Sequence, residues 1–116
     1  MSWIHEGTAE YMRVIAPREF RGIPTPANKL IVLGGLGSPM PLVTLFSSSP
    51  NSQNQKSFYN TAMYFVGFLM IKADASHFHA FLVDMAGGMS EKAALTKDYG
   101  FPNVAAAQAE FTIFSR

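Results

Sequence analysis

Apolar side chains recur at helical spacing along most of the chain after residue 56. The stretch 57–72 carries two neighbouring apolar stripes, so its predicted helix is apolar nearly all round and belongs at the centre of the fold. Further on, apolar residues three and four positions apart predict helices with one buried face. The predicted helices of this half are residues 57–72, 76–86, 91–99 and 104–115.

Polar residues and glycines mark the ends of these helices. A serine or asparagine before a helix accepts hydrogen bonds from the free N–H groups of the first turn. Ser76, Ser90 and Asn103 stand in this position, while Gly87 and Gly100 stand where glycine commonly ends a helix. The boundaries of the last three helices therefore depend on caps as well as on periodicity.

The first half of the chain combines one helix with a long irregular segment. Residues 2–15 predict a helix that ends before Pro17, because the residue before a proline avoids the helical region. Six of the seven prolines lie in residues 16–57, which predicts an irregular Pro/Gly-rich connection between the first and second major helices. Within this connection, residues 41–46 predict a short helix that starts at a proline.

The length of the chain, 116 residues, is enough for one core. We therefore expect a single mainly α domain over residues 1–116, a small bundle of about five helices. Apolar residues make up 48% of the chain and charged residues 15%, whereas about 25% charged residues is typical of soluble domains. This excess predicts an apolar seam that is covered by a second copy, giving a homo-oligomer, or by a missing N-terminal half.

Charge and composition exclude several classes of function. The net charge is +1 and the basic residues are scattered, so nucleic acid is not an expected partner. The chain has no cysteine, which excludes disulfides, thiolate metal sites and cysteine nucleophiles. The longest apolar run, residues 62–71, is half of the roughly 20 residues that a membrane span needs, so no span is expected.

Residues 3–11 read Trp-Ile-His-Glu-Gly-Thr-Ala-Glu-Tyr. This segment resembles the W-L-x-E-G-x-A-E-Y segment of gluzincin zinc metallopeptidases, of the aminopeptidase-N and peptidase MA-like type. The resemblance implies that Glu6 is the third zinc ligand, with Glu10 and His5 around it to orient that ligand. It also implies that Tyr59 is a catalytic residue that donates a hydrogen bond to the tetrahedral intermediate.

The later predicted helices also follow the family's order, although their patterns are less specific. The segments that resemble the C-terminal part of the family are residues 59–69, 77–87, 90–100 and 104–114. The chain departs from the family in having no H-E-x-x-H motif, which supplies two imidazole ligands and a general base. We therefore expect that the chain begins partway through an active site, binds no zinc by itself and is inactive alone.

Other readings of these residues stay open. Glu6 and Glu10 are alternatively charges on a helix surface, and Tyr59 an aromatic residue at the edge of the core. His77 and His79 are two positions apart on a predicted helix, so their side chains point apart and do not share an ion. The glycines of residues 34–38 lack the lysine of a phosphate-binding loop, so a tight turn is the expected role.

Two hypotheses about function follow. In the first, the chain is the C-terminal helical subdomain of a peptide-hydrolysing gluzincin without its zinc-binding helix. In the second, it is a non-enzymatic α-helical protein-binding or scaffolding module that self-associates. An H-E-x-x-H motif encoded in frame about 18–25 residues before Glu6, as the family resemblance implies, favours the first hypothesis, and a true start with an upstream stop codon favours the second.

Overall fold

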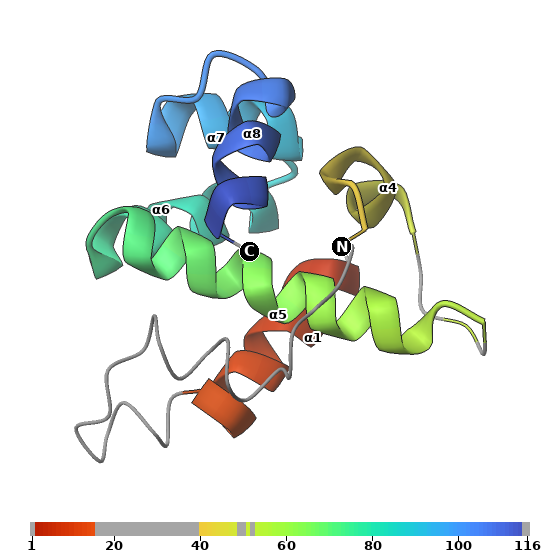
Figure 1. The fold of residues 1–116 in the computed structure, drawn as a ribbon. Helices are drawn as coiled ribbons and strands as arrows, with labels where there is room; N and C mark the ends of the chain where they lie inside the picture. The colour runs from red at the N-terminus through yellow and green to blue at the C-terminus, as the bar shows by residue number, and fades with distance from the viewer. Residues whose placement is uncertain (1, 16–39, 49–50, 52, 115–116) are drawn as a thin grey trace.

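The computed structural model describes residues 2–15, 40–48, 51 and 53–114. All of the regular elements within these ranges are helical, so the mainly α fold predicted from the sequence is confirmed (Figure 1). In chain order they are α1 (Ser2–Glu10), the π-helical turn η1 (Tyr11–Ile15), α4 (Leu42–Ser47), α5 (Gln55–Lys72), α6 (Ala75–Ala86), α7 (Glu91–Tyr99) and α8 (Val104–Phe114).

Helix α5 is the centre of the fold, as its all-round apolar pattern predicts. Every residue from 61 to 69 is buried. Helices α1, α4, α6 and α8 each contact α5, and Figure 1 shows α5 running across the molecule, with α1 crossing it. A helix that is apolar on all sides is stable only when neighbours cover each side, and these four helices do so.

The contact between α1 and α5 is closest at Gly7. A Cβ atom at Gly7 would lie 2.5 Å from the carbonyl oxygen of Ala62 and 2.9 Å from Cγ2 of Val66. Both distances are shorter than a carbon atom tolerates, so the two helix backbones touch at this point. Glycine inside a helix costs about 1 kcal/mol relative to alanine, and here it allows this close approach.

Aromatic rings join α5 to three other elements around Phe65. The ring centroid of Phe65 lies 5.4 Å from that of Trp3 in α1, 5.9 Å from that of Phe46 in α4 and 5.2 Å from that of Phe111 in α8. These separations are those of favourable tilted and edge-to-face ring pairs. The core is therefore built on one aromatic cluster that reaches almost every part of the described fold.

The single tryptophan also makes a polar contact across the fold. Trp3 is buried, and its indole N–H donates to Oε2 of Glu91 at 3.0 Å. Glu91 is the first residue of α7, where a carboxylate is favoured by the helix dipole. This bond connects α1 with α7, 88 positions apart in the chain, and satisfies a buried donor.

Two of the predicted N-caps are confirmed and one is wrong. Ser90 accepts from the N–H of Ala93, and Asn103 accepts from the N–H of Ala106. The cap of α6 is Asp74 rather than Ser76, because the carboxylate of Asp74 accepts from two backbone N–H groups and from the hydroxyl of Ser76 itself. Helix α6 therefore starts one residue earlier than predicted, at Ala75.

Other boundaries shift by one or two residues. Helix α5 starts at Gln55 instead of residue 57. In the turn before it, the side chain of Asn51 accepts hydrogen bonds from the N–H groups of Gln53 and Asn54. The predicted irregular connection therefore ends before residue 55. The helix expected over residues 41–46 is α4, with Pro41 just before its first turn. The predictions for Pro17 and for residues 34–38 lie outside the described residues.

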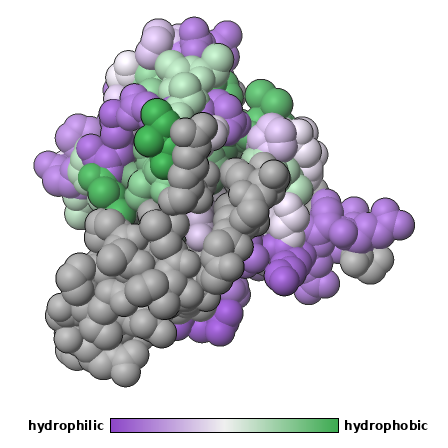
Figure 2. All heavy atoms as spheres, viewed as in Figure 1, coloured by the Kyte–Doolittle hydropathy of each residue, from purple (hydrophilic) through white to green (hydrophobic). Residues whose placement is uncertain are grey.

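Large apolar side chains that stay exposed are spread over the molecule. They are Met12, Val43, Ile71, Val83 and Ile113. Each belongs to a different element, and Figure 2 shows hydrophobic residues interspersed with hydrophilic ones on one face. Single exposed apolar residues are common in monomeric proteins, so the predicted homo-oligomer stays a prediction.

We expect the cap at Asp74 to make stability depend on pH at acidic values. Hydrogen bonds from Ser76 and His77 lower the pKa of Asp74 from 3.8 to about 2. A lowered folded pKa means that the stabilising contribution is present above the unfolded pKa and is lost as the pH falls toward about 2. Asp74→Asn keeps a capping oxygen but does not titrate. It should therefore be less stable than the native chain at about pH 6 but not at about pH 2.

Urea unfolding of both proteins at about pH 6 and about pH 2 measures this difference. Ser76→Ala is the matched variant, since it removes the first of the hydrogen bonds without changing a charge, and it should reduce the pH dependence. A difference between the native chain and Asp74→Asn that is the same at both pH values would contradict the assignment.

Candidate functional site

Helix α1 divides the residues of the candidate motif between separate faces. Trp3, Gly7 and Tyr11 are buried against the core. Glu6 and Glu10 are one turn apart on the same flank of the helix, because residues four positions apart share a face. The structure therefore keeps the two carboxylates of the motif together and separates them from the packing residues.

Glu6 is half-buried on this flank. Within the described part of the chain, its carboxylate takes part in no hydrogen bond and no ion pair. Packing explains the motif positions Trp3 and Gly7. The carboxylate of Glu6, in contrast, accepts no hydrogen bond from any described neighbour. The carboxylate of Glu6 can therefore bind a group that lies outside the described residues.

Glu10 is held by an arginine of the next turn. The guanidinium of Arg13 donates to both oxygens of Glu10, at 2.7 Å from Nη2 and 3.3 Å from Nε. The hydrogen bond that Arg13 donates to Glu10 raises the pKa of Arg13. An exposed pair three positions apart on a helix contributes little to stability.

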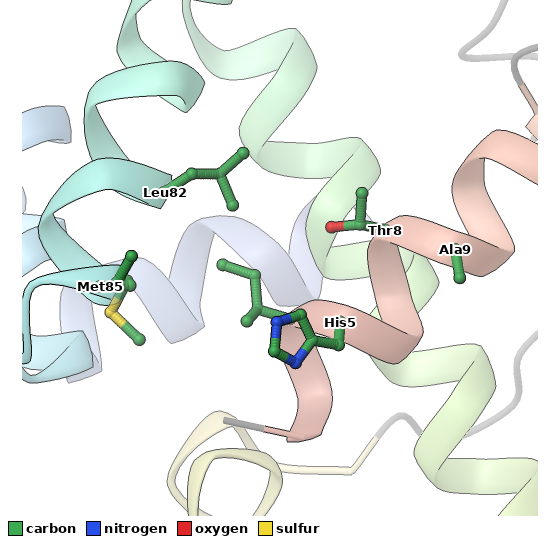
Figure 3. Close-up of a pocket in the computed structure, with 7 residues that line it drawn as sticks. His5, Thr8, Ala9, Leu82 and Met85 are labelled. Carbon is green, nitrogen blue, oxygen red and sulfur yellow. The ribbon is translucent and has the colours of Figure 1, made fainter.

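His5 lies on a different side of α1 from Glu6. Consecutive helical residues point about 100° apart, so these two side chains do not face each other. His5 is exposed and lines a groove against α6 instead (Figure 3). The structure therefore does not bring His5 together with Glu6 as a pair of metal ligands.

Tyr59 lies near the start of α5 at the edge of the core. It is half-buried, and its ring meets that of Phe58 edge-on with centroids 5.7 Å apart. Among the described residues, its hydroxyl shares no hydrogen bond with Glu6, Glu10 or His5. The geometry shows an aromatic residue packed against the core, and the catalytic role of Tyr59 stays a prediction.

The remaining histidines do not form a metal cluster. Nδ1 of His77 lies 2.8 Å from Oδ1 of Asp74, and His79 is exposed elsewhere on α6. Residues two positions apart on a helix point away from each other, as predicted. In the part of the chain that the structure describes, no three histidine or carboxylate side chains are grouped closely enough to hold a metal ion.

A groove lies between α1 and α6. It encloses about 660 Å³ and is lined mainly by apolar atoms (Figure 3). Its lining residues are Ile4, His5, Thr8, Ala9, Leu82, Met85 and Ala86. Sequence reasoning missed this groove, because periodicity shows which residues share one helix face but not which two helices stand side by side.

A pair of aspartates between α6 and α7 was also missed. Both carboxylate oxygens of Asp84 lie 3.1 Å from Nζ of Lys97. Burial raises the pKa of Asp98, while hydrogen bonds from Asp98 and Lys97 lower the pKa of Asp84. The two shifts run in opposite directions, so as the pH falls Asp98 takes up a proton before Asp84 does. No motif spacing identifies such a pair from sequence.

The hydroxyl of Tyr99 is a structural group rather than a reactive one. It donates to the backbone carbonyl of Leu69 at 2.9 Å, at the end of α5. Burial, followed by the charges of Asp98 and Asp74, raises the pKa of Tyr99. The phenol therefore stays protonated and ties α7 to α5.

Two further observations bear on identity. None of the described helices is both long and apolar enough to cross a membrane. Comparisons of the chain with family models, with curated proteins and with solved structures found no match.

Proposed function

We propose that this chain is the C-terminal helical subdomain of a gluzincin-like zinc metallopeptidase. In this proposal Glu6 is the third metal ligand, and a helix outside these 116 residues supplies two imidazoles and the general base. The parent protein would hydrolyse peptide bonds, and Tyr59 is the candidate donor to the oxyanion formed from the peptide carbonyl. The chain by itself is inactive.

The observation that supports the proposal is that packing explains some residues of the α1 motif but not Glu6. Packing accounts for Trp3, which is buried in the aromatic cluster, and for Gly7, which touches the backbone of Ala62. Packing does not account for Glu6, which is half-buried and has no partner among the described residues. A carboxylate that no described residue engages can serve as a metal ligand.

The described residues do not complete a zinc site by themselves. A zinc site in a hydrolase uses three protein ligands and leaves one position for water. The structure groups no three suitable side chains within the residues that it describes. Glu6 would contribute one ligand, and Glu10, fixed by Arg13, would lie beside it. A bound zinc ion would supply Lewis acidity and an activated water once the other ligands are present.

The test is zinc binding by the protein encoded by the complete reading frame around these residues. We expect one zinc per chain in that protein and none in the 116-residue chain, measured by mass spectrometry of the metal content. Glu6→Gln should lower zinc affinity by more than about 100-fold, because loss of a group that only orients a ligand already costs 10–100-fold. Glu10→Gln should lower zinc affinity by about 10–100-fold.

Glu110→Gln is the matched control. Glu110 is an exposed carboxylate that pairs with Lys72 on another part of the fold, at 2.6 Å. Its replacement should leave zinc content and peptide hydrolysis unchanged. A reading frame without an H-E-x-x-H motif before Glu6, or a Glu6→Gln protein that keeps its zinc, would refute the proposal.

A further inference from the structure

We infer that the groove between α1 and α6 binds a small amphipathic carboxylate, an apolar chain that ends in one carboxylate group. Glu6 does not line the groove, and Thr8, which does, points about 200° away from Glu6 around the helix. Binding in the groove therefore does not depend on the proposed zinc site.

The size and lining of the groove suit a small apolar molecule. Its volume of about 660 Å³ falls within the roughly 300–1,000 Å³ typical of small-molecule sites. Leu82 and Met85 of α6 form one wall, and Ile4 of α1 forms the other. The thioether of Met85 is adaptable in shape, which suits a wall against a flexible chain.

One polar atom in this wall lacks a partner. The hydroxyl oxygen of Thr8 is buried and makes no hydrogen bond to any other described residue. Figure 3 shows this oxygen directed from α1 toward α6, on the side of the groove. A buried hydroxyl without a partner costs free energy, because it has lost its bonds to water. Thr8 is only half-buried, so a change of its χ1 rotamer would present the hydroxyl to the groove, where a bond to a ligand atom would recover part of that cost.

The polar groups of the groove favour an anion over a cation. The side chains of Thr8 and His5 both have a hydrogen that they can donate, and Figure 3 shows the His5 ring at the edge of the groove. The lining includes no acidic side chain. A carboxylate accepts hydrogen bonds from both groups, whereas an ammonium group finds no negative partner among these lining residues.

The test is titration of the 116-residue chain with dodecanoate below its micelle concentration, followed by amide shifts in NMR spectra. We expect saturable binding with shifts concentrated on residues 4–9 and 82–86. Dodecanol and dodecylammonium, which share the apolar chain, should bind at least about fivefold more weakly, since one hydrogen bond is worth about 1 kcal/mol. Equal binding of all three probes would overturn the inference.

Two variants separate a ligand contact from a structural role. Thr8→Val keeps the shape of the side chain and removes the unpartnered hydroxyl. It should weaken dodecanoate binding about fivefold while leaving the urea midpoint of the free protein unchanged or higher. Ala9→Trp should fill the mouth of the groove and abolish binding. Ala93→Trp, at an exposed alanine of α7 outside the groove, is its control and should bind normally.

The same titration detects other occupants of the groove. If a second copy of the chain fills it, the apparent affinity for dodecanoate will fall as the protein concentration rises, and sedimentation will show a dimer that Ala9→Trp abolishes. If the groove does not admit a small carboxylate, dodecanoate will show no saturable binding. Either result would overturn the assignment of a small carboxylate.

Discussion

Replacing Phe65 with alanine should lower the free energy of unfolding by about 4 kcal/mol, within the range of about 3–5 kcal/mol for buried aromatic residues. Phe65 is fully buried on α5, and its ring contacts rings from α1, α4 and α8. Its removal leaves a cavity that three different helices would have to close together. A site enclosed from several directions relaxes poorly, so the cost should lie well above the lower limit.

Urea unfolding, followed by far-UV circular dichroism, measures this change. Phe65→Leu preserves most of the volume and should cost less than about 1.5 kcal/mol, which keeps the comparison possible if the alanine protein is too unstable to study. Ile113→Ala is the control for loss of an apolar side chain, because Ile113 is 68% exposed. A loss below about 1 kcal/mol for Phe65→Ala would show that the ring cluster does not hold the helices together.

Replacing Gly7 with alanine should lower the free energy of unfolding by about 3 kcal/mol, at the upper end of the usual cost of overpacking. The added carbon would lie 2.5 Å from the backbone oxygen of Ala62. A flexible side chain could move away, but a carbonyl in the middle of α5 cannot. Helix α1 would therefore have to shift along its contact with α5, even though alanine is the better helix former.

Gly87→Ala is the matched control for this substitution. Gly87 ends α6 with a φ of −80°, and a Cβ atom there would be 3.5 Å from its nearest neighbours, which is ordinary contact. Alanine at such a position should raise stability by about 0.4–1 kcal/mol by restricting the unfolded chain. Equal effects at Gly7 and Gly87 in thermal unfolding would contradict the close backbone contact of α1 with α5.

The helices could be predicted from the sequence because their signals are local. The apolar stripe of α5 and the Ser90 and Asn103 caps depend only on residues a few positions apart. The sequence does not show which residue caps α6, because Asp74 and Ser76 are both of a suitable type. The structure shows that Asp74 accepts the backbone hydrogen bonds. The early start of α5 depends on the side chain of Asn51, which lies outside the helix and outside its pattern.

The candidate site could be predicted only in part, for a related reason. The spacing of Glu6 and Glu10 fixes them on one flank of a helix, and α1 has that helical form. The groove, the unpartnered hydroxyl of Thr8 and the contact of Lys97 with Asp84 all depend on how separate helices meet. Contacts between distant parts of a chain leave no periodic signal, so a single sequence does not reveal them.

The position of Trp3 gives the protein a built-in optical probe. It is the chain's single tryptophan, so all indole fluorescence reports on the place where α1 meets the core. Its emission should be blue-shifted while the indole is shielded and should move to longer wavelength when α1 detaches, whatever the other helices do. Comparing that transition with the loss of helical ellipticity therefore tells whether the first helix melts in the same cooperative step as the rest of the bundle.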